Sequence, residues 1–322
     1  MSWRTKVAAM KLLVSSLALL FVCTFVGSCF QTAALAGLEP KVRDSKLYGE
    51  PQLVEIIGYS EDAMEPCVSP DGRYLFFNNS NEGSVDTHVH FAERVAETKF
   101  RYLGILEGSR SLKKDMAPTM TVDGHIIFTT LRSFDKDHRS LYCGIFKNNR
   151  LTAVAPVSGN LAPSQPFWID MDCGVDPAGQ VLVVSRAQFL PFQGIPGKSD
   201  LFIAHKKADG SFMTDLDSDA VLKTVNSAAL EYAPAITADG LELYFTRAGE
   251  SSVAKKPTPS VEIFVSHRRD SHAAFREPRR LAALEGFVEA PSLTMDKKEL
   301  YFHKKDSTCF HIYRALRSGT QE

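Results

Sequence analysis

Seven acidic residues offer the clearest chemistry in this sequence. They are Asp62, Glu65, Asp115, Asp170, Asp172, Glu231 and Glu289. Their oxygen atoms suit a hard cation such as Ca²⁺, a basic peptide or the hydroxyls of a sugar. Two carboxyls at a suitable separation would also serve glycoside hydrolysis. The structural alternative is that each carboxylate accepts hydrogen bonds from backbone amides between neighbouring units of the fold.

The histidines suggest a metal site only at His88 and His90. Side chains two residues apart on a strand point the same way, so both rings would reach one ion. However, His90 occupies the position that Phe202, Phe264 and Tyr313 fill in similar segments, which favours a packed side chain. A zinc site needs three or four ligands, and the sequence nominates no others. We therefore predict no metal-binding residues here.

Short catalytic motifs are missing from the sequence. It contains no Gly-x-Ser-x-Gly elbow, no His-Glu-x-x-His helix and no Gly-x-x-x-x-Gly-Lys phosphate loop. Any catalysis would therefore depend on the acidic residues and on the elements that bring them together.

Those elements repeat along the chain. Four similar segments begin with Ala-Pro or Glu-Pro and end with Asp-Gly or Asp-Lys: 65–72, 117–124, 233–240 and 290–297. A degenerate copy lies at 172–179. The ends of successive copies are 52, 55, 61 and 57 residues apart. Such an even period predicts one repeat architecture rather than two unrelated domains.

Each copy predicts the same set of antiparallel strands. Asp-Gly suits a tight hairpin turn, because both residues tolerate a positive φ. The runs that follow the turn are rich in aromatic and β-branched residues and too short for helices: 73–77, 125–128, 181–184, 241–245 and 299–302. A third strand is expected at 88–94, 140–146, 200–206, 262–268 and 311–317, and a fourth at 150–154 and 278–284.

Four antiparallel strands per unit, repeated around a ring, make a β-propeller. The sequence therefore predicts an all-β fold of five four-stranded blades, or six if a long loop hides a divergent copy. A strand expected at 52–57 would pair with the last blade and close the ring, which removes two exposed sheet edges. First strands line the central channel of a propeller, so the acidic residues would converge on one funnel-shaped mouth.

The repeat resembles that of the TolB family of propellers. It reads Ala-Pro-x-h-Thr-x-Asp-Gly-x-x-h-Tyr-Phe, where h is apolar, and the resemblance covers roughly residues 50 to 317. It implies a secreted bacterial propeller but no particular activity, since relatives of that family include scaffold proteins, peptidase-associated propellers and sugar-acting enzymes. Lys297 replaces the usual glycine, and the copy at 172–179 lacks the proline.

The N-terminal residues predict export. Three basic residues precede an apolar stretch over 12–30, and a small-x-small cleavage site ends at Ala36. We expect a signal peptide at 1–36. Two alternatives stay open: a lipobox-like match would place a lipid on Cys29, or the stretch would remain as a membrane anchor. Each places the folded part outside the cytoplasm, as a periplasmic protein, a secreted protein or an envelope lipoprotein.

The remaining chain divides simply. We expect a short linker at 37–49, the propeller at 50–318 and a disordered tail at 319–322. Within the propeller, 189–197 is an apolar, Pro/Gly-rich insertion that would lie on one face or fold over the channel, and 249–259 reads as a solvated loop. Arg186, Arg247 and Lys304 follow equivalent strands and are expected to pair with acidic residues of adjacent blades.

Composition limits the partners. Apolar residues make up 44% and charged residues 23% of the chain, an ordinary globular mixture. The net charge of −1, with no basic field, argues against nucleic acid. Cys67, Cys143, Cys173 and Cys309 lie beyond the targeting segment; an oxidising compartment would allow any of three pairings, and unpaired buried thiols are the alternative.

Together these features predict a non-catalytic binding or scaffold module for a protein or glycan at the cell envelope. The alternative is a carbohydrate-active hydrolase or lyase that uses acidic residues in the funnel. Ca²⁺ is the one cofactor that the acidic residues suggest, and contact with a membrane is expected only through a lipid on Cys29 or a retained anchor.

Overall fold

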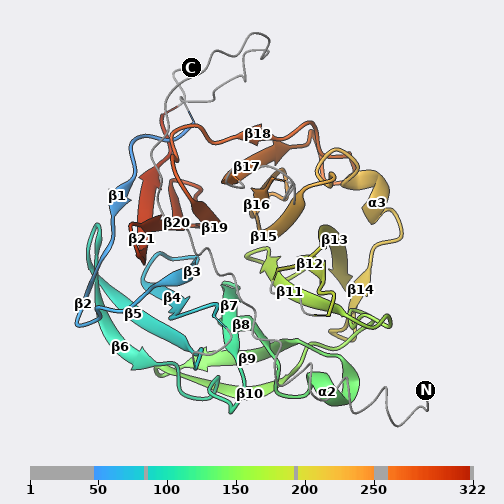
Figure 1. Cartoon of the computed structure of the whole chain (residues 1–322), viewed down its shortest axis with the longest axis horizontal. Coiled ribbons are helices and arrows are strands. Elements are labelled where there is room, and N and C mark those ends of the chain that lie inside the picture. Colours follow the sequence, from blue (N-terminus) through green and yellow to red (C-terminus); the bar gives the residue numbers. More distant parts are fainter. Residues whose placement is uncertain (1–46, 83–85, 192–194, 250–259, 320–322) are drawn as a thin grey trace.

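Five β-sheets stand in a ring around a central axis (Figure 1). The computed structural model describes residues 47–82, 86–191, 195–249 and 260–319. The prediction of an all-β propeller with five blades is confirmed, and the described residues form no sixth blade. The predicted signal peptide, most of the predicted linker, nearly all of 249–259 and residues 320–322 lie outside the described residues.

Blades 1 and 2 come from the first half of the chain. Blade 1 has the strand order β2-β6-β5-β4-β3, with β2 (Glu55–Ile57), β3 (Met64–Val68), β4 (Tyr74–Asn78), β5 (Val89–Ala96) and β6 (Lys99–Ile105). Blade 2 contains β7 (Asp115–Met120), β8 (His125–Thr130), β9 (Leu141–Lys147) and β10 (Arg150–Pro156), and the one-turn helix α2 (Phe134–Asp137) follows β8.

Blades 3, 4 and 5 complete the ring. Blade 3 contains β11 (Trp168–Val175), β12 (Val181–Gln188), β13 (Lys198–Lys206) and β14 (Phe212–Thr214), followed by helix α3 (Ser218–Val221). Blade 4 contains β15 (Leu230–Ile236), β16 (Glu242–Ala248), β17 (Val261–His267) and β18 (Arg279–Arg280). Blade 5 contains β19 (Val288–Leu293), β20 (Glu299–Asp306), β21 (Cys309–Leu316) and the N-terminal β1 (Gln52–Leu53).

The second strand of each blade is apolar on both faces because each blade packs between two others. In β16, Leu243, Tyr244 and Phe245 are all fully buried although they are consecutive. Tyr244 packs toward blade 5 against Phe302, whereas Phe245 packs toward blade 3. Burial on both faces explains why these runs are continuously apolar instead of alternating.

The N-terminal segment closes the ring, but it does so across two blades. Gln52 of β1 pairs with Arg314 of β21 in blade 5, as expected from the sequence. Glu55 of β2 instead pairs in parallel with Lys99 of β6 in blade 1. Val54 separates the two strands because its side chain turns into the core between these blades. The predicted single strand at 52–57 is therefore two short strands.

Each first strand carries a β-bulge near the start of the repeat. In four blades the residue before the proline has a left-handed conformation: Glu65 (φ 49°), Ala117 (φ 49°), Ala233 (φ 49°) and Ala290 (φ 56°). The bulge turns the N–H of that residue away from its own sheet and toward the preceding blade. A side chain of that blade accepts the hydrogen bond in every case.

These acceptors form a ring of hydrogen bonds between blades. Asn78 Oδ1 accepts from Ala117 at 3.1 Å, Asp172 Oδ1 from Ala233 at 2.9 Å, Thr246 Oγ1 from Ala290 at 2.9 Å, and His303 Nδ1 from Glu65 at 2.9 Å. At the junction of blades 2 and 3 the direction reverses, and the Thr129 hydroxyl donates to the Met171 carbonyl at 2.9 Å.

The glycine in the degenerate copy of the repeat, in blade 3, has a steric reason. At the position that directly follows the proline in the other copies, β11 has Gly174. A Cβ at this position would lie 2.1 Å from the carbonyl oxygen of Pro234 in blade 4. Blade 3 therefore needs glycine where the neighbouring backbone approaches most closely.

We predict that Tyr48 stabilises the closure of the ring. Its ring is 2% exposed, packs in the core between blades 4 and 5, and its hydroxyl lies 3.1 Å from that of Tyr244. Tyr48→Ala should lower the free energy of unfolding by about 3–5 kcal/mol in urea. Leu53→Ala in the same segment is the control, because Leu53 is 52% exposed. Equal losses in the two variants would contradict a special role for Tyr48.

Candidate functional site

A small cavity lies on the axis of the ring, where all five blades meet. We call it the axial cavity; its volume is about 10 Å³. It is lined by Glu65, Asn81, Met116, Met171, Asp172, Tyr232, Ala233, Glu289, Ala290 and His303. Three of the seven predicted acidic residues therefore meet there, namely Glu65, Asp172 and Glu289.

Glu289 has a donor for each carboxylate oxygen. The Tyr232 hydroxyl donates to Oε1, and His303 Nε2 lies 2.9 Å from Oε2. The backbone N–H of Glu65 donates to Nδ1 of the same imidazole. Nδ1 is thus an acceptor and carries no proton, so Nε2 carries the ring proton and donates it to Glu289. The architecture therefore fixes His303 as a neutral donor.

Glu65 is held less completely. Its Oε1 accepts from Asn81 Nδ2 at 2.9 Å, whereas its buried Oε2 has no hydrogen-bond partner among the described residues. Part of the residue contacts solvent, but this oxygen does not. Burial raises the pKa of Glu65 to about 7, and nearby Glu289 adds to the shift. Its φ of 49° is also unusual for a residue with a long side chain.

Asp172 joins the cavity wall and the hydrogen-bond ring at once. Its Oδ1 accepts the N–H of Ala233 in the next blade. Burial raises the pKa of Asp172 well above its usual value, and the negative charge of Glu65 adds to the shift. Asp172 therefore has the structural role that is the alternative to ligand binding: it accepts a hydrogen bond from a backbone amide of the neighbouring blade.

Asp115, Asp170 and Glu231 form a different structure, which we call the arginine clamps. Each carboxylate is almost fully buried and pairs with an arginine of the same blade. The pairs are Arg132 Nη2 with Asp115 Oδ1 at 2.9 Å, Arg186 Nε with Asp170 Oδ1 at 2.7 Å, and Arg247 Nε with Glu231 Oε1 at 2.7 Å.

The rest of each clamp also repeats. The guanidinium donates to a carbonyl of the loop before the first strand, namely that of Ser109, Leu161 or Val225. It also lies over an aromatic ring of the third strand, namely that of Tyr142, Phe202 or Phe264. Burial raises the pKa of Asp170 to about 6, against the opposing effect of Arg186. The clamps use their carboxylates to hold each blade together.

The expectation that the basic residues pair between adjacent blades is wrong. Arg186 and Arg247 pair within their own blades, because their strand lies beside the one that carries the acid. Lys304 occupies the equivalent place in blade 5, where Val288 replaces the acid, and its ammonium lies 5.5 Å from the centre of the Tyr313 ring.

Asp62 lies outside the axial cavity and the clamps. Its Oδ1 accepts the N–H of Phe310 at 2.9 Å, and its carbonyl accepts the Tyr59 hydroxyl at 2.8 Å. It therefore links blade 1 to blade 5 at the edge of the ring where first strands begin. The structure thus divides the seven acidic residues into three at the cavity, three in clamps and one between blades.

A cluster of apolar side chains adjoins the axial cavity. This mouth cluster consists of Leu131, Ile169, Met171, Ala187, Phe189, Tyr232, Ala248 and Val261, with Phe134, Leu230, Ala233 and Phe287 packed against it. These residues lie where first strands begin and second strands end, so they share one edge of the ring. Met171 and Tyr232 belong to both the cluster and the cavity wall. Apolar side chains therefore lie beside the acidic ones at this edge of the ring.

The described residues offer no ready metal site. Nowhere in them do three His, Cys, Asp or Glu side chains come together closely enough to hold a metal ion. His90 packs against Phe77 and shares a hydrogen bond of 2.7 Å with the Tyr102 hydroxyl, and burial lowers its pKa to about 4. His88 is buried beside it and lies 3.9 Å from Asp115.

Two further predictions concern thiols and membranes. Cys67, Cys143, Cys173 and Cys309 are all unpaired, and only Cys309 is exposed. Across the described ranges, no helix has the length and apolar character of a membrane span.

The sequence missed part of the axial site. Tyr232, Asn81 and His303 line the cavity, yet no motif marks them. Only the alignment of the repeats could have indicated His303. It occupies the position of Thr246 and Asn78 in other blades, and it is the one titratable residue at this position among these three blades. Tyr232 similarly replaces Met116 in the aligned repeat.

Together, the ring and its axial site define a five-bladed β-propeller with a small, acidic cavity at its centre. The sequence matches no protein family and no curated protein. Among solved structures, a glycosyl hydrolase from Bacteroides ovatus is similar in fold: it is 11% identical, the match covers 89% of this chain and 97% of that one, and the TM-score is 0.51.

Two other structures are similar. A family 117 glycoside hydrolase of the marine bacterium Zobellia galactanivorans is 8% identical, with 85% of this chain and 92% of that one covered and a TM-score of 0.51. TolB from Acinetobacter baumannii is 12% identical, with 81% of this chain covered and a TM-score of 0.40. This chain spans about half the length of TolB, namely 55%. At these identities the similarity shows the propeller fold and no activity.

Chemically, the axial cavity can bind and release protons but has little room for a substrate. A volume of about 10 Å³ is close to the space of one water molecule. The Glu65 and Asp172 carboxyls share this space with Glu289, and burial favours the protonated form of the first two.

We predict that Glu65 makes the stability of the protein depend on pH. The pKa of Glu65 is about 7 in the folded protein, whereas the ordinary value for a glutamate is 4.5, so the folded form binds the proton more tightly than the unfolded form. The stabilisation is present below about pH 4.5 and is lost as the pH rises through 7. Relative to wild type, Glu65→Gln should gain roughly 1–3 kcal/mol between pH 5 and pH 8 in urea unfolding.

The matched control is Glu55→Gln. The Glu55 side chain is 54% exposed and pairs with Lys99 on the surface, so its pH profile should follow that of wild type. If Glu65→Gln also follows wild type across this range, the buried carboxyl does not hold its proton as described.

Proposed function

We propose that this chain is a non-catalytic binding module, an exported propeller that holds a protein or glycan ligand at the cell envelope. One observation carries the proposal: the acidic centre is too small for a sugar or a peptide. The axial cavity has a volume of about 10 Å³, and the mouth cluster adjoins it through Met171 and Tyr232. A sugar or peptide therefore meets the outside of the mouth rather than the buried carboxylates.

Aromatic side chains at this edge of the ring supply the contact surface. We call Phe134, Phe167, Trp168, Phe287 and Phe310 the mouth rim; Phe167 is exposed and the other four are half-buried. They come from blades 2, 3 and 5, at the edge of the ring where first strands begin. Grouped, exposed aromatic rings are typical of binding surfaces and contribute much of the binding energy there.

Phe167 is the most distinctive member of the mouth rim. It is 40% exposed and has a φ of 70°, a left-handed conformation that bulky residues rarely adopt. Its carbonyl accepts the N–H of Phe189 at 2.8 Å, which ties it to the apolar insertion after β12. A strained backbone that holds an apolar ring in solvent is better explained by ligand contact than by stability.

The location outside the cytoplasm rests on the N-terminal sequence. The basic residues, the apolar stretch and the site at Ala36 are typical of an export signal. Of the alternatives, cleavage after Ala36 leaves the propeller free in the envelope space, whereas a lipid on Cys29 holds it at a membrane. Mass spectrometry of the mature N-terminus distinguishes these outcomes.

We predict that Phe167→Ala weakens ligand binding. The full chain is exposed to a panel of polysaccharides and peptides, with and without Ca²⁺, and both retention and new products are followed by mass spectrometry. Loss of the ring should weaken retention of the bound ligand by roughly tenfold or more. Leu216→Ala is the control, because Leu216 is 99% exposed and lies just before α3, away from the mouth rim. Unchanged retention by Phe167→Ala would remove the mouth rim from the proposal.

A carbohydrate-active hydrolase or lyase is the second candidate, and Glu65 favours it. A carboxyl with a pKa near 7, an unpaired oxygen and a left-handed backbone has properties of a general acid. Catalysis would require the mouth cluster to open. New products in the panel that disappear with Glu65→Gln, while Glu55→Gln still forms them, would establish this candidate and overturn the binding module.

A further inference from the structure

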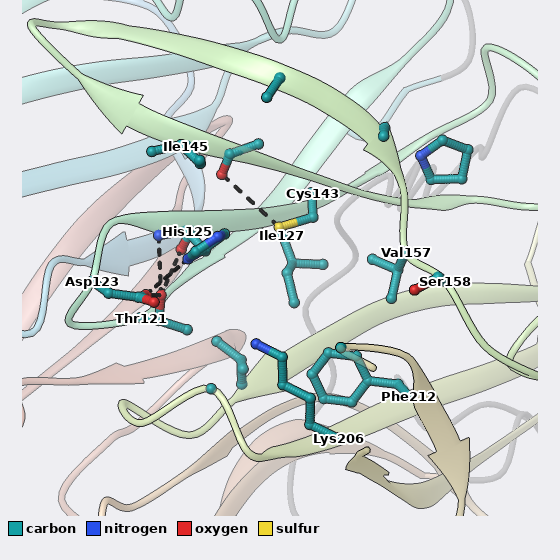
Figure 2. A pocket seen from close by; sticks show the side chains of 17 residues that line it. Thr121, Asp123, His125, Ile127, Cys143, Ile145, Val157, Ser158, Lys206 and Phe212 are labelled. Carbon is teal, nitrogen blue, oxygen red and sulfur yellow. Dashed lines mark hydrogen bonds and ion pairs between the residues drawn. The ribbon is translucent and has the colours of Figure 1, made fainter. Parts of the chain in front are cut away.

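A second pocket lies between blades 2 and 3, at the edge of the ring opposite the mouth rim. Figure 2 shows this interblade pocket, whose volume is about 290 Å³. The hairpin turns after Thr121 and before Gly179 lie at its end, which places it near the Asp-Gly side of the blades. The volume is at the lower limit of ordinary ligand pockets, so it suits a small molecule.

Apolar side chains form most of the wall. Ile127 and Ile145 come from blade 2, Val175 and Phe212 from blade 3, and Val157 from the segment that joins the two blades. Phe212 is 6% exposed, and its N–H donates to the carbonyl of Ser158. Because strands of both sheets hold these residues, the wall is part of the rigid fold.

Lys206 supplies a positive charge inside this apolar wall. It is the last residue of β13 and is half-buried, and its side chain extends into the pocket beside the Phe212 ring (Figure 2). In the described part of the chain its ammonium group forms neither a hydrogen bond nor an ion pair. An ammonium group without an anionic partner, next to an apolar wall, can donate charge-assisted hydrogen bonds to an anion that enters the pocket.

The other titratable groups of the pocket do not neutralise Lys206. The Asp123 carboxylate is already held by the Thr121 hydroxyl and lies 2.9 Å from His125 Nδ1. The Thr121 hydrogen bond and the interaction with His125 lower the pKa of Asp123 to about 2. Burial raises the pKa of Cys143 to about 11, so its thiol is uncharged and leaves the ammonium without a counter-ion.

We propose that the interblade pocket binds a small amphipathic carboxylate. The apolar body of the ligand packs against Ile127, Val175 and Phe212, and its carboxylate accepts hydrogen bonds from the Lys206 ammonium. Both parts are needed, because the wall alone would select any apolar molecule and the lysine alone would select any anion. This site is separate from the mouth rim and does not depend on the function proposed for it.

The test uses the full chain and octanoate as the probe. Octan-1-ol and octylammonium are matched probes that keep the chain and change the charge. Isothermal titration calorimetry should show tighter binding of octanoate than of either, by roughly 10- to 100-fold, since a charge-assisted hydrogen bond distinguishes them.

Variants then locate the binding. Lys206→Met should weaken octanoate binding by roughly tenfold or more, Lys206→Arg should retain it, and Lys207→Met is the control because Lys207 is exposed next to it. Ala155→Trp, at the exposed rim of the pocket, should block all three probes. Equal affinities for octanoate and octan-1-ol, or octanoate binding that survives both Lys206→Met and Ala155→Trp, would overturn the proposal.

Discussion

The fold depends on one hydrogen bond that recurs between blades. The sheet of one blade does not continue into the sheet of the next. In each first strand that has the left-handed residue, the bulge turns a backbone N–H away from its own sheet. A side chain of the preceding blade must therefore accept the hydrogen bond from that N–H. An unsatisfied buried amide would cost about 1–3 kcal/mol at each of the four junctions that have this bond. Asn78, Asp172, Thr246 and His303 meet this demand with different chemical groups. The axial cavity is thus lined partly by groups that the architecture itself requires.

The blades were predictable because their signals are local. An Asp-Gly turn and the apolar run after it lie within a dozen residues, and both recur at an even period. The closing segment was predicted as one strand because its composition is continuous; its division at Val54 depends on blades 1 and 5 being side by side. Likewise, the glycine in the third copy only makes sense once Gly174 meets the backbone of Pro234. Contacts between residues far apart in sequence carried the information that was missing.

The candidate site was predicted in part for the same reason. The structure brings Glu65, Asp172 and Glu289 to the axis, whereas the clamp acids turn toward arginines of their own blade. A signal for the clamps was present, since Asp170 and Arg186 are 16 residues apart, as are Glu231 and Arg247. Such pairs face each other across a hairpin. Nothing in the sequence indicates that apolar side chains cluster beside the cavity, because these come from four different blades.

The division of the closing segment also sets the order of assembly. Its strands β1 and β2 use edges formed by β21 and β6, so the earliest part of the propeller waits for the latest. Contacts between the two ends of a chain form slowly. Until the last blade is present, Tyr48 has no core to enter, and the core around Val54 lacks Tyr301 and Ile312. A chain that crosses a membrane from its N-terminus would therefore complete its ring only after the whole polypeptide has emerged.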